Sequence, residues 1–138
     1  MSTVWAMNAE ELFGAIEDSG SLPVGVEADE AAAAVLCSVL ARMELQPARA
    51  LLDALGDELV QVIGRCPIHE GQPGESFDEP QLLARIASHF ELAPEAVRPM
   101  TAAVLSAIRQ RVARETGAQV ERQLPTPILE LWRGAGAP

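Results

Sequence analysis

A helical pattern that occurs twice, 69 residues apart, is the strongest constraint on the fold of this chain. In the second copy, Val104, Ile108 and Val112 recur at every fourth position, which is the spacing of one apolar stripe on an amphipathic helix. Moved back by 69 residues, the run AAVL at 102–105 falls on the run AAVL at 33–36. The period is about half of the chain, too long for a solenoid unit, and it indicates the duplication of a small multi-helix unit.

The correspondence extends beyond these two runs. Apolar residues of the first half fall on apolar residues of the second at the same offset, as Val39, Met43 and Leu55 fall on Ile108, Val112 and Leu124. Upstream the offset becomes 70, and Leu12, Phe13 and Ile16 fall on Leu82, Leu83 and Ile86. The helix starts also correspond, because Asn8 with Glu11 and Asp78 with Gln81 each have the spacing of an N-cap and N3 pair. A chance register between Ala- and Leu-rich helices is the alternative.

The predicted fold is all-α, a helical bundle of two pseudo-repeated multi-helix units. The units cover about residues 8–65 and 78–134, and a loop at 66–77 that contains two Pro and two Gly joins them. A chain of 138 residues is expected to be a single domain, 1–138, and can bury about two-thirds of its unfolded surface.

In the first half we expect helices from about Ala9 to Glu17, from about Glu27 to Met43, and from Pro47 to Gly64. In the second half a helix is expected from Asp78 to about Phe90. A long helix is expected to begin near Pro99, because proline disrupts a helix interior, with residues 94–98 forming a single preceding turn.

The last third of the chain contains signals for two further helices. Thr116 with Gln119 is interpreted as a capping box that starts one helix, and Pro125 ends it. Thr126 followed by Pro127 is interpreted as the start of a short last helix that carries Trp132. Trp132 is expected to close the core; stacking on a ligand is the alternative.

The charge of the chain is strongly negative and unevenly distributed. The net charge of -10 works against binding to nucleic acid or to anionic membranes. Residues 1–69 hold eleven acids and three Arg, whereas residues 70–138 hold nine acids and seven Arg. A candidate interaction surface that would dock an acidic partner consists of Arg109, Arg111, Arg114 and Arg122. A solvated helix face of mixed charge is the alternative.

No apolar run approaches the roughly 18 residues that a membrane span needs, and the N-terminus lacks the basic and then apolar segments of a secretion signal. We therefore expect a cytoplasmic protein that does not bind membranes. Cys37 is expected to be a small core residue, and a disulfide with Cys66 is not expected in a reducing compartment.

Cys66 and His69, in the predicted loop, form the only cluster of metal-capable residues. A zinc site needs three or four ligands, and the remaining candidates, Cys37 and His89, are distant and on predicted helices. No metal and no other cofactor is expected.

Glu10 and Glu17 share a helix face, but acid catalysis needs a carboxylate in a desolvated cleft, and acids in a first helical turn are ordinary partners of the helix dipole. Gln123 is expected to bond the backbone where its helix stops. No nucleophile elbow, metalloprotease motif or glycine-rich phosphate loop is present, so no catalytic residue is assigned and the protein is predicted not to be an enzyme.

The second half resembles the C-terminal repeat of the bacterial domain-of-unknown-function family 2267 (DUF2267). The residues that carry the resemblance are AAVL at 102–105, the triplet QLP at 123–125 and LELW at 129–132. The first half is similar to the family's N-terminal repeat through AAVL at 33–36, and the resemblance covers roughly residues 9–134. Where the family commonly repeats QLP, the first half has Ala54-Leu55-Gly56, so its helix break is expected to be softer or absent. The resemblance implies an all-α fold of duplicated helical units and no established activity.

These observations predict a non-catalytic protein-interaction or regulatory module that binds a protein partner or associates with itself. The alternative is a small-molecule carrier with an apolar pocket between the two halves.

Overall fold

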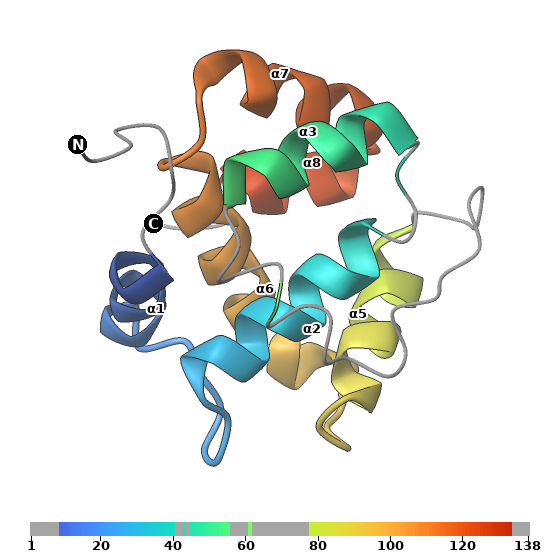
Figure 1. Ribbon diagram of the computed structural model, residues 1–138. Coiled ribbons are helices and arrows are strands. Elements are labelled where there is room, and N and C mark those ends of the chain that lie inside the picture. The colour runs from blue at the N-terminus through green and yellow to red at the C-terminus, as the bar shows by residue number, and fades with distance from the viewer. Residues whose placement is uncertain (1–8, 41–42, 44, 56–60, 62–77, 134–138) are drawn as a thin grey trace.

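The computed structural model describes residues 9–40, 43, 45–55, 61 and 78–133 (Figure 1). These ranges contain no strand and seven α-helices, labelled as in Figure 1: α1 (Ala9–Asp18), α2 (Ala28–Leu40), α3 (Leu45–Leu55), α5 (Glu79–Ser88), α6 (Pro94–Arg109), α7 (Arg114–Gln123) and α8 (Thr126–Arg133). The predicted all-α fold is confirmed. The predicted loop at 66–77, the predicted end of the third helix at Gly64 and the cap at Asn8 lie outside the described residues.

The predicted helix starts at Asp78 and Glu27 are confirmed by their hydrogen bonds. The Asp78 side chain caps α5 by accepting a bond of 3.2 Å from the backbone N–H of Gln81. At the start of α2, the backbone N–H of Glu27 donates to the Glu30 carboxylate at 3.1 Å, which is half of a capping box.

The expected break at Pro99 is wrong, because α6 runs without interruption from Pro94 to Arg109 with Pro99 inside it. A proline in the second turn removes one hydrogen bond, to the carbonyl of Glu95, and both residues are exposed. The same segment buries Val97, Met100 and Thr101 on the inner face of the helix. Packing of that face outweighs the lost bond.

The capping box predicted at Thr116 is also wrong. The helix α7 begins at Arg114, its N-cap is Ala113 in an extended conformation, and no side chain caps it. The tight turn after α6 ends at Ala113, and burial of Gly117 and Val120 against the core fixes the start of the helix there. The predicted stop before Pro125 is confirmed, since Leu124 leaves the helical region. The last helix begins at Thr126, which is its first helical residue rather than its cap.

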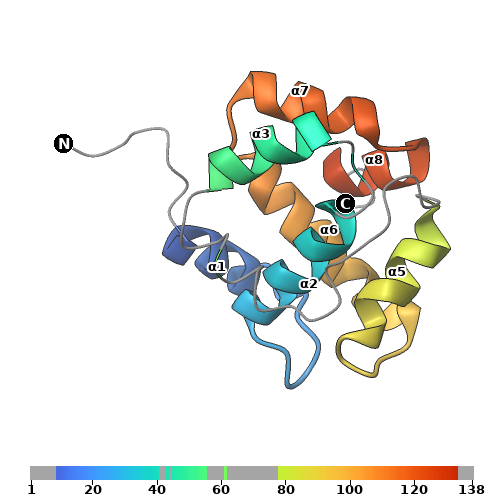
Figure 2. The ribbon, with the colours of Figure 1, turned by 45° about the vertical axis from the view of Figure 1, so that its right-hand side comes forward.

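Helix α6 runs through the centre of the molecule and contacts α1, α2, α5 and α8. Figures 1 and 2 show α1, α2 and α5 in a lower layer and α3, α7 and α8 in an upper layer, with α6 passing between them. The fully buried side chains of the core come from both layers and include Leu12, Ile16, Leu36, Leu51, Leu82, Ile86, Met100, Leu105, Ile108 and Trp132. The positions that the apolar pattern assigns to the inner faces are therefore inside.

The two halves have matching helices and matching neighbours. The bounds of α1 plus 70 give those of α5, and α2 and α6 end 69 residues apart, as α3 and α7 begin. Helix α1 contacts α2 and α6, and in the same way α5 contacts α6 and α2. The pairs α2 with α6 and α3 with α7 each join equivalent helices. This is the arrangement of two related units about a pseudo-two-fold axis, although the duplication itself stays a prediction.

Replacement of Pro99 tests the balance within α6. We expect Pro99→Ala to raise the free energy of unfolding by about 1–2 kcal/mol, because it restores one helical hydrogen bond and loses only the smaller entropic benefit of proline. The matched control is Pro94→Ala at the first helical position, where proline is favourable, with an expected loss of about 0.5 kcal/mol. Denaturant unfolding measures both, and a loss of stability in Pro99→Ala would contradict the packing argument.

Candidate functional site

Two of the predicted surface arginines meet at a hollow beside the turn between α6 and α7. Arg109 is the last residue of α6 and Arg114 is the first of α7, and both are exposed. The hollow, called here the α6–α7 hollow, has a volume of about 340 Å³ and is lined by Arg109, Val112, Ala113, Arg114, Gly117, Ala118 and Glu121. Its floor contains the small residues Gly117 and Ala118, so a bound group can approach the helix backbone closely.

The other two predicted arginines lie elsewhere. Arg111 lines a second hollow, of about 530 Å³, with Glu11, Gly14, Ala15, Asp18 and Gln110; we call it the α1 hollow. The Arg111 guanidinium donates a hydrogen bond of 3.0 Å to the carbonyl of Ala107, which holds it at the end of α6. Arg122 is exposed near the end of α7 and lines neither hollow. The structure thus divides the predicted surface among three places.

Glu121, at the edge of the α6–α7 hollow, joins α7 to α8. One carboxylate oxygen accepts a hydrogen bond of 3.1 Å from the indole N–H of Trp132, and the other accepts one of 2.9 Å from the Arg133 guanidinium. The hydrogen bond from Arg133 lowers the pKa of Glu121, and the Trp132 bond and the charges of Arg133 and Arg109 act in the same direction, while burial opposes them. Glu121 is therefore ionised at neutral pH.

Sequence reasoning did not assign a role to Glu121. The available signal was Trp132, because a buried tryptophan usually finds an acceptor for its indole N–H. Trp132 is 1% exposed, so it closes the core as expected. Its acceptor lies 11 residues earlier on another helix, and spacing along the chain does not identify it.

The remaining candidate residues are separate from both hollows. Glu10 and Glu17 are exposed on α1, and Gln123 is half-buried in the last turn of α7. Cys37 is buried in α2, while Cys66 and His69 lie outside the described residues. Within the described ranges, no three His, Cys, Asp or Glu side chains are grouped as metal ligands would be.

The fold and the site define an all-α protein with charged hollows on its surface. Residues 9–131 match DUF2267, a family described as uncharacterized conserved proteins, and the chain belongs to this family. The resemblance found in the sequence is confirmed. No curated protein matches the chain. None of the described helices combines the length and the apolar character that crossing a membrane requires.

The role of Glu121 can be tested by removing its side chain. We expect Glu121→Ala to lower the free energy of unfolding by about 1–2 kcal/mol, since the indole N–H of Trp132 loses its acceptor. Glu130→Ala, an exposed acid on α8, is the matched control and should change stability by less than about 0.5 kcal/mol. In a double-mutant cycle with Trp132→Phe, zero coupling would contradict the assigned contact.

The pH dependence of stability gives a second test. A carboxyl whose pKa is lower in the folded state binds more protons when unfolded, so its stabilising contribution is present above its ordinary pKa of about 4.5 and is lost as pH falls below it. The difference in unfolding free energy between wild type and Glu121→Gln should therefore be largest near neutral pH and decrease below pH 4.5. A difference that grows as the pH falls would contradict the assigned ionisation.

Proposed function

We propose that this protein is a non-catalytic interaction module that binds a protein partner through the α6–α7 hollow and the arginines around it. The observation that supports this most strongly is the pair Arg109 and Arg114. Both are exposed, and among the described residues no hydrogen bond or ion pair occupies their guanidinium groups. Arginine is enriched at protein interfaces because its planar group binds carboxylates with two parallel hydrogen bonds.

The sign of the charge at this hollow indicates the chemistry of the partner. Glu121 lines the hollow, but its charge is balanced by Arg133 at 2.9 Å, so Arg109 and Arg114 leave the hollow positive. Because the chain as a whole has a net charge of -10, the hollow is a local exception. It fits an acidic protein surface, and the overall charge disfavours nucleic acid and anionic lipid.

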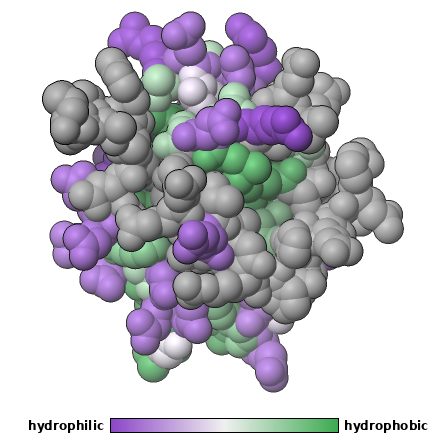
Figure 3. All heavy atoms as spheres, viewed as in Figure 1, coloured by the Kyte–Doolittle hydropathy of each residue, from purple (hydrophilic) through white to green (hydrophobic). Residues whose placement is uncertain are grey.

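The packing between the halves favours an interaction module over a small-molecule carrier. A carrier of the kind considered needs an apolar pocket between the halves, where α2 faces α6. Their side chains Val35, Leu36, Val104 and Leu105 are at most 1% exposed. Both hollows described above open at the surface and include charged residues (Figure 3).

A capture experiment with intact-mass measurement tests the proposal. The tagged full chain, returned to cells of its native host, should retain a protein that Arg109→Ala/Arg114→Ala loses at least about tenfold, since two charged contacts are removed. The matched control is Arg49→Ala/Arg98→Ala, which removes two other exposed arginines. Equal capture by both double variants would contradict the proposed surface. The proposal that the protein is not an enzyme fails if a turnover found in the wild type is lost in a folded Glu10→Gln or Gln123→Ala variant.

A further inference from the structure

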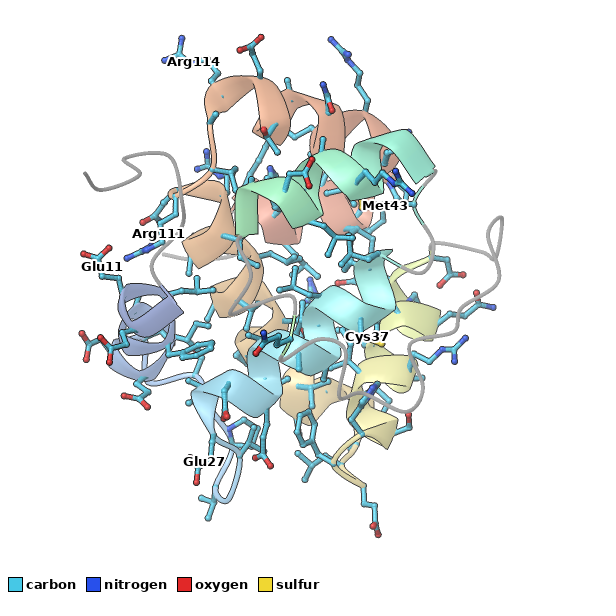
Figure 4. The ribbon with its side chains drawn as sticks, viewed as in Figure 1. Glu11, Glu27, Cys37, Met43, Arg111 and Arg114 are labelled. Atoms are coloured by element: carbon cyan, nitrogen blue, oxygen red, sulfur yellow. The ribbon has the colours of Figure 1, made fainter. Side chains whose placement is uncertain are left out.

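The two hollows are neighbours on one side of the molecule. Gln110 and Arg111 line the α1 hollow, and the residues on either side of them, Arg109 and Val112, line the α6–α7 hollow. The short turn after α6 therefore separates them. Figure 4 shows Glu11, Arg111 and Arg114 along the same left-hand edge, with α1 below and α7 above.

The hollows carry charges of opposite sign. Glu11 and Asp18 line the α1 hollow against the single charge of Arg111, which gives an acidic balance. Arg109 and Arg114 make the α6–α7 hollow basic, because Arg133 balances Glu121. Each hollow also has a Gly-Ala pair in its lining, and a Cβ added at Gly14 would meet nothing within 4 Å. Both hollows thus allow a partner helix or loop to approach closely.

Two of these charges have the unfavourable sign for their own helices. Asp18 is the last residue of α1, and the last turn of that helix holds no basic residue. Arg114 is the first residue of α7, whose N-cap makes no side-chain hydrogen bond. The helix dipole favours cations at a C-terminus and anions at an N-terminus, so it opposes both charges in the isolated chain. A partner that brings a cation to Asp18 and an anion to Arg114 relieves both.

A second copy of this chain supplies both groups at once. On the basis of the proposed interaction module, we infer that the partner is a second copy, bound through a two-fold symmetric contact across the turn between α6 and α7. Rotation of one copy by half a turn about an axis through that turn places its basic hollow on the acidic hollow of the other, and the reverse contact forms at the same time. A two-fold contact requires such a self-complementary patch, and adjacent hollows of opposite sign provide it.

Sedimentation velocity and native mass spectrometry of the purified full chain test this inference. We expect a dimer whose dissociation constant rises at least about tenfold from about 0.01 M to about 1 M salt, over which the screening length falls from about 30 Å to about 3 Å. Arg114→Glu and Asp18→Arg should each weaken the dimer at least about tenfold. Mixed together, they should form a dimer with one copy of each, because the reversed charges match again. Arg122→Glu and Glu17→Arg make the same charge changes outside the hollows and should leave the dissociation constant within about threefold.

The same variants distinguish lost association from lost folding. Arg114→Glu and Asp18→Arg each place the favoured sign at a helix end, so their unfolding temperatures should equal or exceed that of the wild type. A wild type that stays monomeric, a mixture that does not dimerise, or an assembly larger than a dimer overturns the two-fold contact. If the wild type is monomeric and the capture experiment still returns a partner dependent on Arg109 and Arg114, only the second copy is refuted. If no partner is captured either, the proposed function fails as well.

Discussion

Burial of one face of α6 is the constraint on which the rest of the structure depends. Four helices pack on it, and Val97, Met100, Val104, Leu105 and Ile108 are at most 1% exposed. At about 1.5–3 kcal/mol for each large apolar side chain, this face outweighs the single hydrogen bond and the steric cost, about 3 kcal/mol, of Pro99. The helix therefore continues where a local rule predicts a break, and it connects the two layers of the fold.

The end of that helix determines where the charged face lies. After Arg109 the chain reverses in a few residues, and α7 begins at Arg114 without a side-chain cap. The contact of Glu121 with Trp132 and Arg133 then fixes α7 on α8 and holds the carboxylate away from Arg114's end of the helix. As a result, two arginines frame one side of the turn, and Arg111 with the acids of α1 lies on the other.

Most of the fold follows from the sequence, because apolar periodicity reports directly on burial. It located α1, α5 and the inner faces of α2 and α6, and the pair Asp78 and Gln81 located a cap to the residue. Thr116 failed as a cap because contacts with the core, distant in sequence, fixed the start of α7. The arginines could be found as a cluster along the chain, but spacing does not show on which side of a tight turn each side chain falls. The acidic neighbour of Arg111 comes from α1, almost a hundred residues earlier.

Hydrogen exchange of the backbone amides measures most directly whether the charged face is the contact surface. The amides of Arg114, Glu115 and Thr116 begin a helix that no side chain caps, so they are suited to report on anything that covers the turn. Exchange is compared between the free chain and the chain saturated with its partner, whichever protein that is. The account predicts slower exchange at residues 110–118 in the complex. Unchanged exchange there, with protection at another surface, would contradict it.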